Sequence, residues 1–362
     1  MIMTGLRGVG KTVLLNRFAE LAEMAGWESI ELEASKHDET AFRQSIFSKF
    51  RAALLHISPR RRWSERARHA AEVLSSFVLS IDQSGTFSVT WDVDPSEGYG
   101  DHGDLGLDLT DVFLAVGEVA KEKGTGIVLL IDEVHFLTTV QLESLIQAVH
   151  KSVQKKLPIT FVGAGLPQIA ELAGDAKSYA ERLFKFPRID SLTPEEARQA
   201  LVGPAETENV SYDEDAVDLA VSLTHGYPYF IQELGYQAWI VASGNHITAE
   251  DISTAKDAYE AKLDGSFFRV RLDRATPLQT AYMRAMAELG SEPQKAADVA
   301  SLMKRESSQV APIRSQLIDM GLLYTPQHGY AAFTVPDFDK FMMRAVPRLE
   351  VPEIQHRRRH KK

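Results

Sequence analysis

The residues near the N-terminus combine glycines with a lysine and a threonine at a spacing suited to phosphate chemistry. Gly5, Gly10, Lys11 and Thr12 complete the pattern G-x-x-x-x-G-K-T, and Gly8 adds another glycine inside it. Glycine lets the backbone wrap around a phosphate with its N–H groups pointing inward, and a helix starting near Lys11 adds its N-terminal dipole. The spacing therefore predicts a phosphate loop, the Walker A motif, in which Lys11 reaches the β- and γ-phosphates and Thr12 ligates Mg²⁺.

Two adjacent carboxylates follow a buried strand further along the chain. Residues 127–133, IVLLIDE, place Asp132 and Glu133 after an unbroken apolar run, which is typical of a parallel strand buried on both faces. Open α/β sheets bind ligands at the carboxyl ends of such strands. With the phosphate loop, the pattern predicts a Walker B motif in which Asp132 holds Mg²⁺ and Glu133 is the general base. His135 is expected to cap or pack beside the next helix, rather than to bind nucleotide or metal.

The composition is that of an ordinary globular chain with two or three domains. The 362 residues are 44% hydrophobic and 25% charged, and the chain has no cysteine, which excludes disulfides and cysteine-ligated metals. No apolar run is long enough for a bilayer and no secretory signal is evident, so we expect a cytoplasmic protein without membrane contact. The net charge of −10 argues against nucleic-acid binding over the whole surface. The tail His356–Lys362 is either a local basic patch or a solvated end.

Alternating strand and helix patterns up to residue 190 predict an α/β domain with a parallel doubly wound sheet. The first strand must be short, because only four residues precede Gly5. The expected elements are a strand at 1–4, a helix from Lys11, a strand at Ser29–Glu33, a helix at 40–57, a helix ending at Gly124, the strand before Asp132, a helix at 139–156 and strands at Ile159–Val162 and Phe184–Ile189.

The stretch 58–107 is the least regular part of this domain and is interpreted as an insertion. Phe87, Val89, Trp91 and Val93 alternate with polar residues, which predicts a half-buried strand before a loop rich in glycine and aspartate. The insertion is either a surface for a protein partner or a long loop with one edge strand, and the sequence does not decide between these alternatives.

After Thr193 the pattern contains helices only. Thr193, Pro194 and Glu196 form a capping box with proline at the first helical position. Further helices are expected at 213–223, 227–242, 248–263, Leu278–Leu289, Ala296–Lys304 and Gln309–Met320, and then two strands around Gln327-His328-Gly329. The last three helices and the hairpin are typical of a winged helix. The predicted domains are therefore 1–190 with the insertion, a helical lid at 191–265, a winged helix at 266–346 and a basic tail at 347–362.

In this arrangement the chain resembles AAA+ ATPases of the origin-recognition/initiator type and the related STAND-like bacterial ATPases. The resemblance covers almost the full length and is carried by GLRGVGKT, LLIDEVHFL, FVGAGLP, HGYPYFIQ and FTVPDFDKFM. It implies a P-loop parallel sheet, an all-α lid and a C-terminal winged helix. It also implies ATP hydrolysis with ATP and Mg²⁺ as cofactors, and nucleotide-dependent homo-oligomers. Relatives carry a segment before the first strand that helps to close the adenine pocket, and this sequence does not show it. Either the start codon is assigned too far downstream or the protein is naturally shorter, and only for the shorter form do we expect weak adenine binding.

The resemblance also implies roles for individual residues. Lys11, Glu133 and Arg182 are the candidate catalytic residues. Arg182 is either an arginine finger or an arginine that faces the nucleotide, or else a surface arginine paired with Glu181 or another acid. Thr12 and Asp132 are the candidate metal ligands. The candidate cofactor-binding residues are Gly5, Leu6, Arg7, Gly8, Val9, Gly10, Lys11, Thr12, Val13 and Pro228.

Two positions depart from the family pattern. Gly163–Gly165 stand where the fourth strand usually ends in a polar residue, and Tyr227–Tyr229 replace a lid arginine that senses the γ-phosphate. Both departures predict a slow ATPase that acts as a switch.

Two partners are compatible with such a switch. On the third helix of the winged helix, Gln309, Arg314 and Gln316 lie away from the apolar face, where they could read base edges of DNA, and the basic tail could contact phosphates. The alternative is a signalling or defence ATPase in which the winged helix and residues 58–107 bind protein. A small-molecule kinase is disfavoured by Glu133 and by the winged helix.

Overall fold

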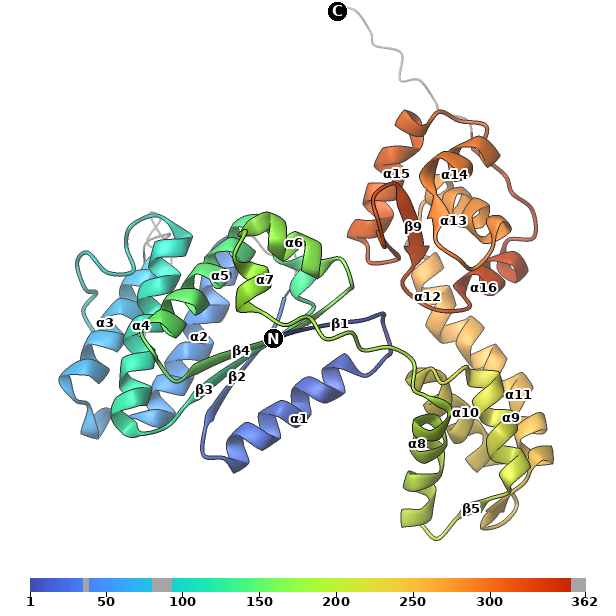
Figure 1. Ribbon diagram of the computed structural model, residues 1–362, viewed down its shortest axis with the longest axis horizontal. Helices are drawn as coiled ribbons and strands as arrows, with labels where there is room; N and C mark the ends of the chain where they lie inside the picture. The colour runs from blue at the N-terminus through green and yellow to red at the C-terminus, as the bar shows by residue number, and fades with distance from the viewer. Residues whose placement is uncertain (35–38, 80–92, 353–362) are drawn as a thin grey trace, which may run out of the picture. The chain divides into compact units, whose positions relative to one another are not determined.

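The computed structural model describes residues 1–34, 39–79 and 93–352 (Figure 1). These residues form two compact units. The first contains Met1–Gly5 and Gly10–Ile189, and the second contains Leu6–Val9 together with the chain from Asp190 onward. Within the described residues, no helix combines the length and the apolar character needed to cross a membrane.

The first unit is built on a parallel four-stranded sheet with the order β1-β4-β3-β2. The strands are β1 (Ile2–Thr4), β2 (Glu28–Glu33), β3 (Ile127–Asp132) and β4 (Ile159–Gly165). The register pairs the last residues of neighbouring strands, so that Thr4 lies beside Gly165, and Glu33 lies beside Asp132. The carboxyl ends of the strands therefore meet at one edge, where sheets of this kind bind ligands.

The segment Phe184–Ile189 does not form the regular last strand that the sequence predicts. It runs beside β1, whose amides donate to the carbonyls of Lys185 and Pro187, but only Arg188 makes an isolated parallel bridge to Thr4. Pro187 has no N–H group and cannot continue a hydrogen-bonded ladder. The prediction is thus right about the path of the chain and wrong about the strand.

Helices cover both faces of the sheet (Figure 1). α1 (Lys11–Met24) lies on one face, where Leu15 and Ala19 pack against Val128 and Leu130 of β3. The alternate β3 residues, such as Leu129, face the larger core formed with the helices of the opposite side. Those helices are α2 (Glu39–Ile57), α3 (Glu65–Leu79), α4 (Leu105–Lys123), α5 (Thr139–Gln154), α6 (Ile169–Ala176) and α7 (Ala180–Leu183).

The stretch 58–107 contains a helix that the sequence analysis did not predict. α3 is amphipathic and buries Ala67, Ala71, Leu74 and Phe77 in the main core. The strand expected from Phe87 lies almost wholly outside the described residues.

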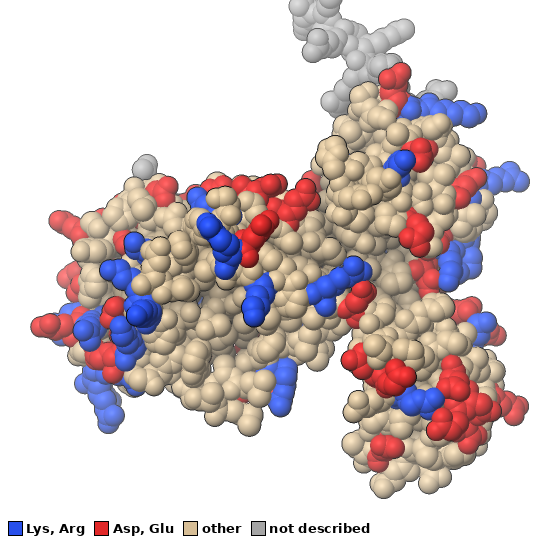
Figure 2. Space-filling view, in the orientation of Figure 1, with Lys and Arg blue, Asp and Glu red and all other residues tan. Residues whose placement is uncertain are grey.

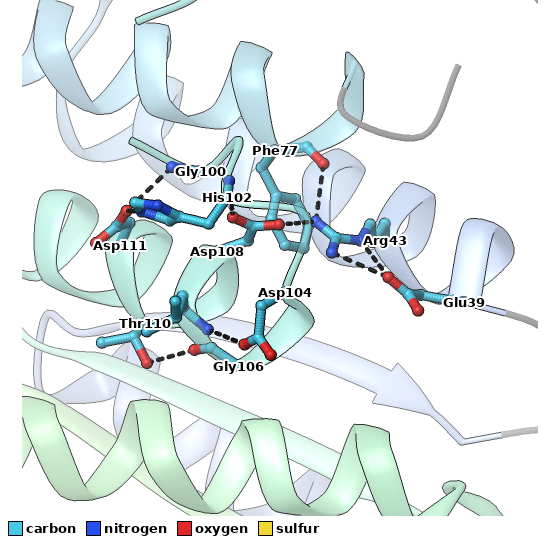
Figure 3. A network of polar contacts seen from close by, with 11 residues as sticks. Glu39, Arg43, Phe77, Gly100, His102, Asp104, Gly106, Asp108, Thr110 and Asp111 are labelled. Atoms are coloured by element: carbon cyan, nitrogen blue, oxygen red, sulfur yellow. Dashed lines mark hydrogen bonds and ion pairs between the residues drawn. The ribbon is translucent and has the colours of Figure 1, made fainter. Parts of the chain in front are cut away.

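A buried ion pair ties α2 to α4 beside this segment (Figure 3). Arg43 on α2 donates to Asp108 on α4 at 2.8 Å, and the two side chains are 1% and 0% exposed. Arg43 also bonds to Glu39 and to the Phe77 carbonyl of α3, while Asp108 accepts the His102 N–H of the preceding loop. Burying both charges is tolerated because each is hydrogen-bonded on several sides.

In the second unit, the first helices form the region predicted as a lid. They are α8 (Pro194–Thr207), α9 (Glu214–Thr224), α10 (Pro228–Val241) and α11 (Ala249–Lys262), with a small parallel pair, β5 (Ser211–Tyr212) and β6 (His246–Ile247). The capping box expected at Thr193 is confirmed, because its hydroxyl accepts the N–H of Glu196 and the Glu196 carboxylate accepts the N–H of Thr193.

A continuous helix leads from this region to the C-terminal helices. After α11 the chain passes through a π-helical stretch, η3 (Leu263–Phe268), into α12 (Arg269–Leu272) without a loop. Phe267 of η3 stacks on Tyr229 of α10 with ring centroids 4.3 Å apart. Phe268 stacks on Phe341 of α16 (Phe338–Ala345) at 5.2 Å. The π-helical stretch thus contacts both groups of helices within the second unit.

The C-terminal part contains the three helices and the hairpin that the sequence predicts. The helices are α13 (Pro277–Leu289), α14 (Ala296–Leu302) and α15 (Ser307–Asp319), and the strands are β7 (Gln294–Lys295), β8 (Leu323–Tyr324) and β9 (Tyr330–Phe333), in the antiparallel order β7-β9-β8. These elements agree with the expected pattern, and the winged-helix interpretation itself stays a prediction.

Candidate nucleotide-binding site

The loop between β1 and α1 has the backbone shape that a phosphate loop needs. Gly8 and Gly10 adopt φ values of +86° and +91°, a left-handed conformation that glycine reaches without strain. Unlike α5, α8, α11 and α13, which begin with capping boxes, α1 begins with no side-chain cap at Gly10. The first N–H groups of a helix need acceptors, and a phosphate at this end would supply them.

Lys11 places its ammonium group inside the same loop. The residue is only 7% exposed, and Nζ donates to the Gly5 carbonyl at 3.0 Å. A positive charge therefore lies at the centre of the loop, where the sequence analysis expects the phosphates.

Thr12 and Asp132 meet although they lie on different elements. The Thr12 hydroxyl at the start of α1 donates to Oδ2 of Asp132 at the end of β3, at 2.5 Å. The other oxygen, Oδ1, accepts the N–H of Glu133 at 2.7 Å. A hydroxyl and one carboxylate fit Mg²⁺, which usually keeps several waters and takes further ligands from substrate phosphates. The described residues contain no group of three or more acidic, histidine or cysteine side chains that could hold a metal.

Glu133 has a strained backbone at the tip of β3. Its φ of +52° lies in the left-handed region, which is unusual for a residue other than glycine, and it begins the short 3₁₀ helix η2 (Val134–Phe136). Such strain costs about 1–3 kcal/mol and concentrates at functional sites, because the surrounding structure must impose it. The tight turn brings the Glu133 carboxylate to 3.4 Å from Nε2 of His135, by the Oε2–Nε2 distance.

His135 is buried, as expected of a residue that packs beside the next segment. Its side chain is 1% exposed and its ring centroid lies 4.3 Å from that of Phe136. Sequence reasoning did not anticipate its two polar contacts, to Glu133 and to the N–H of Leu166, which donates to Nδ1 at 3.2 Å. The only available signal was the spacing of Asp132, Glu133 and His135 in the D-E-x-H sequence.

The middle of the loop, Leu6–Val9, belongs by its contacts to the second unit. There Tyr229 donates its N–H to the Gly8 carbonyl, and Arg7 donates its N–H to the Thr334 carbonyl, both at 3.2 Å. The Tyr227 ring also lies against Gly8, and burial raises the pKa of its hydroxyl. Pro228 lies between Tyr227 and Tyr229 in the sequence, and its expected role near the nucleotide stays a prediction.

Arg182 stands apart from these contacts. It is an exposed residue of the short helix α7 in the first unit. In the described part of the chain it forms no ion pair with Glu181. Its role as an arginine finger stays a prediction.

The three residues of α15 that were expected to face DNA form hydrogen bonds within their own domain. Arg314 donates to the Tyr330 carbonyl of the hairpin at 2.6 Å, Gln316 accepts from the side chain of Gln279 at 2.9 Å, and the Gln309 side chain accepts the N–H that begins the capping box of α15 at 3.0 Å. The prediction that they lie away from the apolar face is right for Gln309 and Gln316, which are exposed, whereas Arg314 is half-buried. The basic tail His356–Lys362 lies outside the described residues.

Two family models match parts of this chain. The AAA domain family matches residues 1–170. Residues 265–342 match a domain of unknown function. Comparison with the curated proteins gives no match.

Comparison with solved structures gives similarities at low sequence identity. The Walker-type ATPase PABY2304 of Pyrococcus abyssi is similar over 94% of this chain and 90% of its own, with 16% identity and a TM-score of 0.58. Cdc6p from Pyrobaculum aerophilum is 15% identical over 96% of this chain and 88% of its own, with a TM-score of 0.43. The Thermotoga maritima RuvB Holliday junction branch migration motor is 14% identical over 97% and 87%, with a TM-score of 0.44. The first of these supports the predicted fold, a parallel sheet flanked by helices.

Proposed function

We propose that this chain is a molecular switch that binds ATP with Mg²⁺ and hydrolyses it slowly to ADP. The observation that carries the proposal is the bond between Thr12 and Asp132 at 2.5 Å. It joins the start of α1 to the end of β3 and places a hydroxyl and a carboxylate beside the phosphate loop, as a magnesium nucleotide requires.

Each residue of the site then has a distinct task. Lys11 binds the β- and γ-phosphates, and Thr12 and Asp132 hold Mg²⁺, which supplies positive charge against the phosphate oxygens. Glu133, one residue beyond Asp132, accepts a proton from the attacking water. The N–H groups from Gly8 to Val13 bind the phosphate oxygens.

A slow rate is supported by the end of β4. Gly163, Ala164 and Gly165 offer no polar side chain toward the site, so one of the groups that usually contacts the γ-phosphate or the water is absent from these described positions. Fewer contacts that strengthen in the transition state mean a higher barrier and a longer-lived ATP-bound state. Such a state suits a switch better than a motor.

Titration of the purified chain with ATP, with and without Mg²⁺, and measurement of phosphate release test this proposal. We expect Mg²⁺-dependent binding, slow turnover in the wild type, and in Glu133→Gln retained binding with turnover reduced to a small residual rate. A chain that does not bind ATP in the presence of Mg²⁺ would overturn the proposal, whereas turnover retained in Glu133→Gln would assign the base to another residue.

A protein is a better supported partner for this switch than DNA. The side chains of Gln309, Arg314 and Gln316 are already bonded within their domain, so reading DNA bases would require these bonds to break. In the view of Figure 2, acidic side chains crowd over the lid region, and residues 191–265 contain far more Asp and Glu than Lys and Arg. Such a surface repels nucleic acid.

DNA is the alternative partner, and it would contact the protein at the turn before α15. Lys304 is exposed there, and a lysine in this position could bind phosphate without using α15. A shift assay with duplex DNA at low and high salt separates the partners. Salt-sensitive binding that Lys304→Glu weakens would favour DNA, and no binding at low salt would leave the protein partner.

An oligomer formed with ATP is the setting in which Arg182 would act. Its exposed position suits an arginine that completes a neighbouring subunit's site. Size-exclusion chromatography of Glu133→Gln with ATP would show the assembly, and Arg182→Ala would then lower turnover without weakening ATP binding. A monomer under all nucleotide conditions would exclude this role.

A further inference from the structure

The protonation of the His135 ring is fixed by a backbone group at the end of β4. The N–H of Leu166 points at Nδ1 of His135, at 3.2 Å. An amide N–H can only donate, so Nδ1 must present a lone pair, and the single proton of a neutral imidazole then resides on Nε2. The ring is buried, with 1% of its side chain exposed, so it cannot turn freely to another arrangement.

The nitrogen that carries this proton faces the candidate base. Nε2 of His135 lies 3.4 Å from Oε2 of Glu133. This separation is somewhat longer than a hydrogen bond, and catalytic hydrogen bonds are often long without substrate and shorten in the complex. The strained backbone of Glu133, with φ at +52°, directs its side chain into this contact.

The absence of a side chain at Gly165 makes room for the ring. A Cβ atom built on Gly165 would lie 3.3 Å from Nδ1 of His135 and 3.0 Å from a methyl group of Val134, and both contacts are tighter than most real Cβ contacts. Gly165 thus has two effects. It leaves the end of β4 without a polar side chain, and it allows the His135 ring to lie close to this strand end.

We infer that His135 is a positioning residue, which holds the Glu133 carboxylate in place for catalysis and links it to the end of β4. The link runs from the Leu166 N–H to Nδ1, through the ring, and from Nε2–H to Glu133. In this way a backbone amide and a histidine replace the polar side chain that β4 lacks. The inference rests on the proposed ATPase function, and His135 itself does not touch the substrate.

Two substitutions separate the two ring contacts. In His135→Gln the side-chain amide nitrogen can take the place of Nε2 and donate to Glu133. In His135→Asn the side-chain oxygen can take the place of Nδ1 and accept from Leu166, but nothing reaches Glu133. We expect His135→Asn to lower kcat roughly 10- to 100-fold, as losses of supporting contacts do, with unchanged ATP affinity, and His135→Gln to keep most of the activity.

A double-mutant comparison separates positioning from general damage to the fold. If His135 acts through Glu133, adding His135→Asn to Glu133→Gln should not lower the residual rate further. Equal losses in His135→Asn and His135→Gln, no loss in either, or additive losses in the double variant would overturn the inference. Thermal unfolding of each variant shows whether the fold is retained.

A measurement without nucleotide tests the contact itself. Nitrogen-15 NMR of the histidine rings in the full chain distinguishes the two neutral tautomers, and the His135→Asn variant identifies the signal of His135. We expect a proton on Nε2 and none on Nδ1; a proton on Nδ1 would overturn the inference whatever the kinetics show. If the wild type shows no ATP turnover, the proposed function fails and the positioning role fails with it. If only Glu133→Gln impairs turnover, the inference alone fails.

Discussion

The sequence analysis assigned two sets of polar residues to binding, one at the carboxyl edge of the sheet and one on the outer face of α15. In the structure the two sets differ in their hydrogen-bond partners. At the sheet edge, Thr12 and Asp132 come from positions 120 residues apart and meet at 2.5 Å. On α15, Arg314 turns back to the hairpin and Gln316 to α13. The first region brings together polar groups from two distant parts of the chain, and the second uses its polar groups to connect its own elements.

The difference follows from how each prediction is made. The phosphate loop pattern specifies a backbone conformation, with glycines that adopt left-handed φ values and a helix that begins at Lys11, so the positions of its groups are largely determined. The prediction for α15 rests on helical periodicity, which shows which residues face away from the apolar core. Periodicity does not show that β9 lies close enough for Arg314 to reach its carbonyl.

Arg43→Met should give the largest loss in the free energy of unfolding. It shows how much stability an arginine contributes when its role is purely structural, and Arg314 can be compared with it. It removes one partner of a buried pair and leaves Asp108, which is 0% exposed, with an uncompensated charge. We expect a loss of about 3–5 kcal/mol in the free energy of unfolding, measured by chemical denaturation. A loss below about 1 kcal/mol, the range of surface pairs, would mean that water reaches Asp108.

Lys11→Ala tests whether the sheet edge is a ligand site. Removing a charged donor to phosphate costs about 3 kcal/mol, so we expect ATP to bind roughly 100-fold more weakly, with little change in unfolding. Isothermal titration measures the affinity. Lys49→Ala, an exposed lysine of α2, is the matched control and should bind ATP like the wild type. Equal affinities in the two variants would remove the distinction between the sheet edge and α15.

Arg314→Ala tests the other side of the comparison. The guanidinium bonds to the Tyr330 carbonyl and to the Thr325 hydroxyl, so we expect a stability loss of about 1–3 kcal/mol and unchanged ATP affinity. Denaturation measures the loss, with the exposed Arg274→Ala as control. Unchanged stability together with weakened DNA binding would show that Arg314 is available to a partner after all.

The smallest effect should come from pH. The hydrogen bond to Asp111 raises the pKa of His102, which lies in the loop before α4. A raised pKa in the folded chain means that the contribution to stability is complete below about pH 6.5, the unfolded value, and is lost as pH rises through the folded value. Thermal unfolding between pH 5.5 and 8 should show this decline in the wild type. His102→Gln should lack it, and an identical profile in the two would refute the assignment.

Much of the fold could be predicted because its signals are local. The apolar run of β3, the capping box at Thr193 and the glycine at the end of α4 each mark an element from a few residues. α3 was missed because its buried face contains several alanines, among them Ala67 and Ala71, which give only a weak apolar periodicity. The last strand failed because a single Pro187 interrupts a segment whose composition otherwise favours a strand.

The candidate site shows the same limit. The positions of Lys11, Thr12 and Asp132 could be predicted because their motifs imply one geometry, while their roles stay predictions. The contact of His135 with Glu133 could not, because it depends on a left-handed turn at Glu133 and on the path of the chain after Gly165. Neither feature leaves a pattern in the sequence, since a positive φ at glutamate results from tertiary structure rather than from local preference.

The unbroken helix from Ala249 to Leu272 has a mechanical consequence. A loop between two groups of helices absorbs movement, whereas a helix resists both bending and torsion and transmits rotation along its axis. Phe267 and Phe268, adjacent in the π-helical stretch of this helix, are stacked on Tyr229 and on Phe341. We therefore expect that a displacement of Tyr229 rotates this helix about its axis and so moves α16. The helices of the lid region and the C-terminal helices would then rotate together as a rigid body.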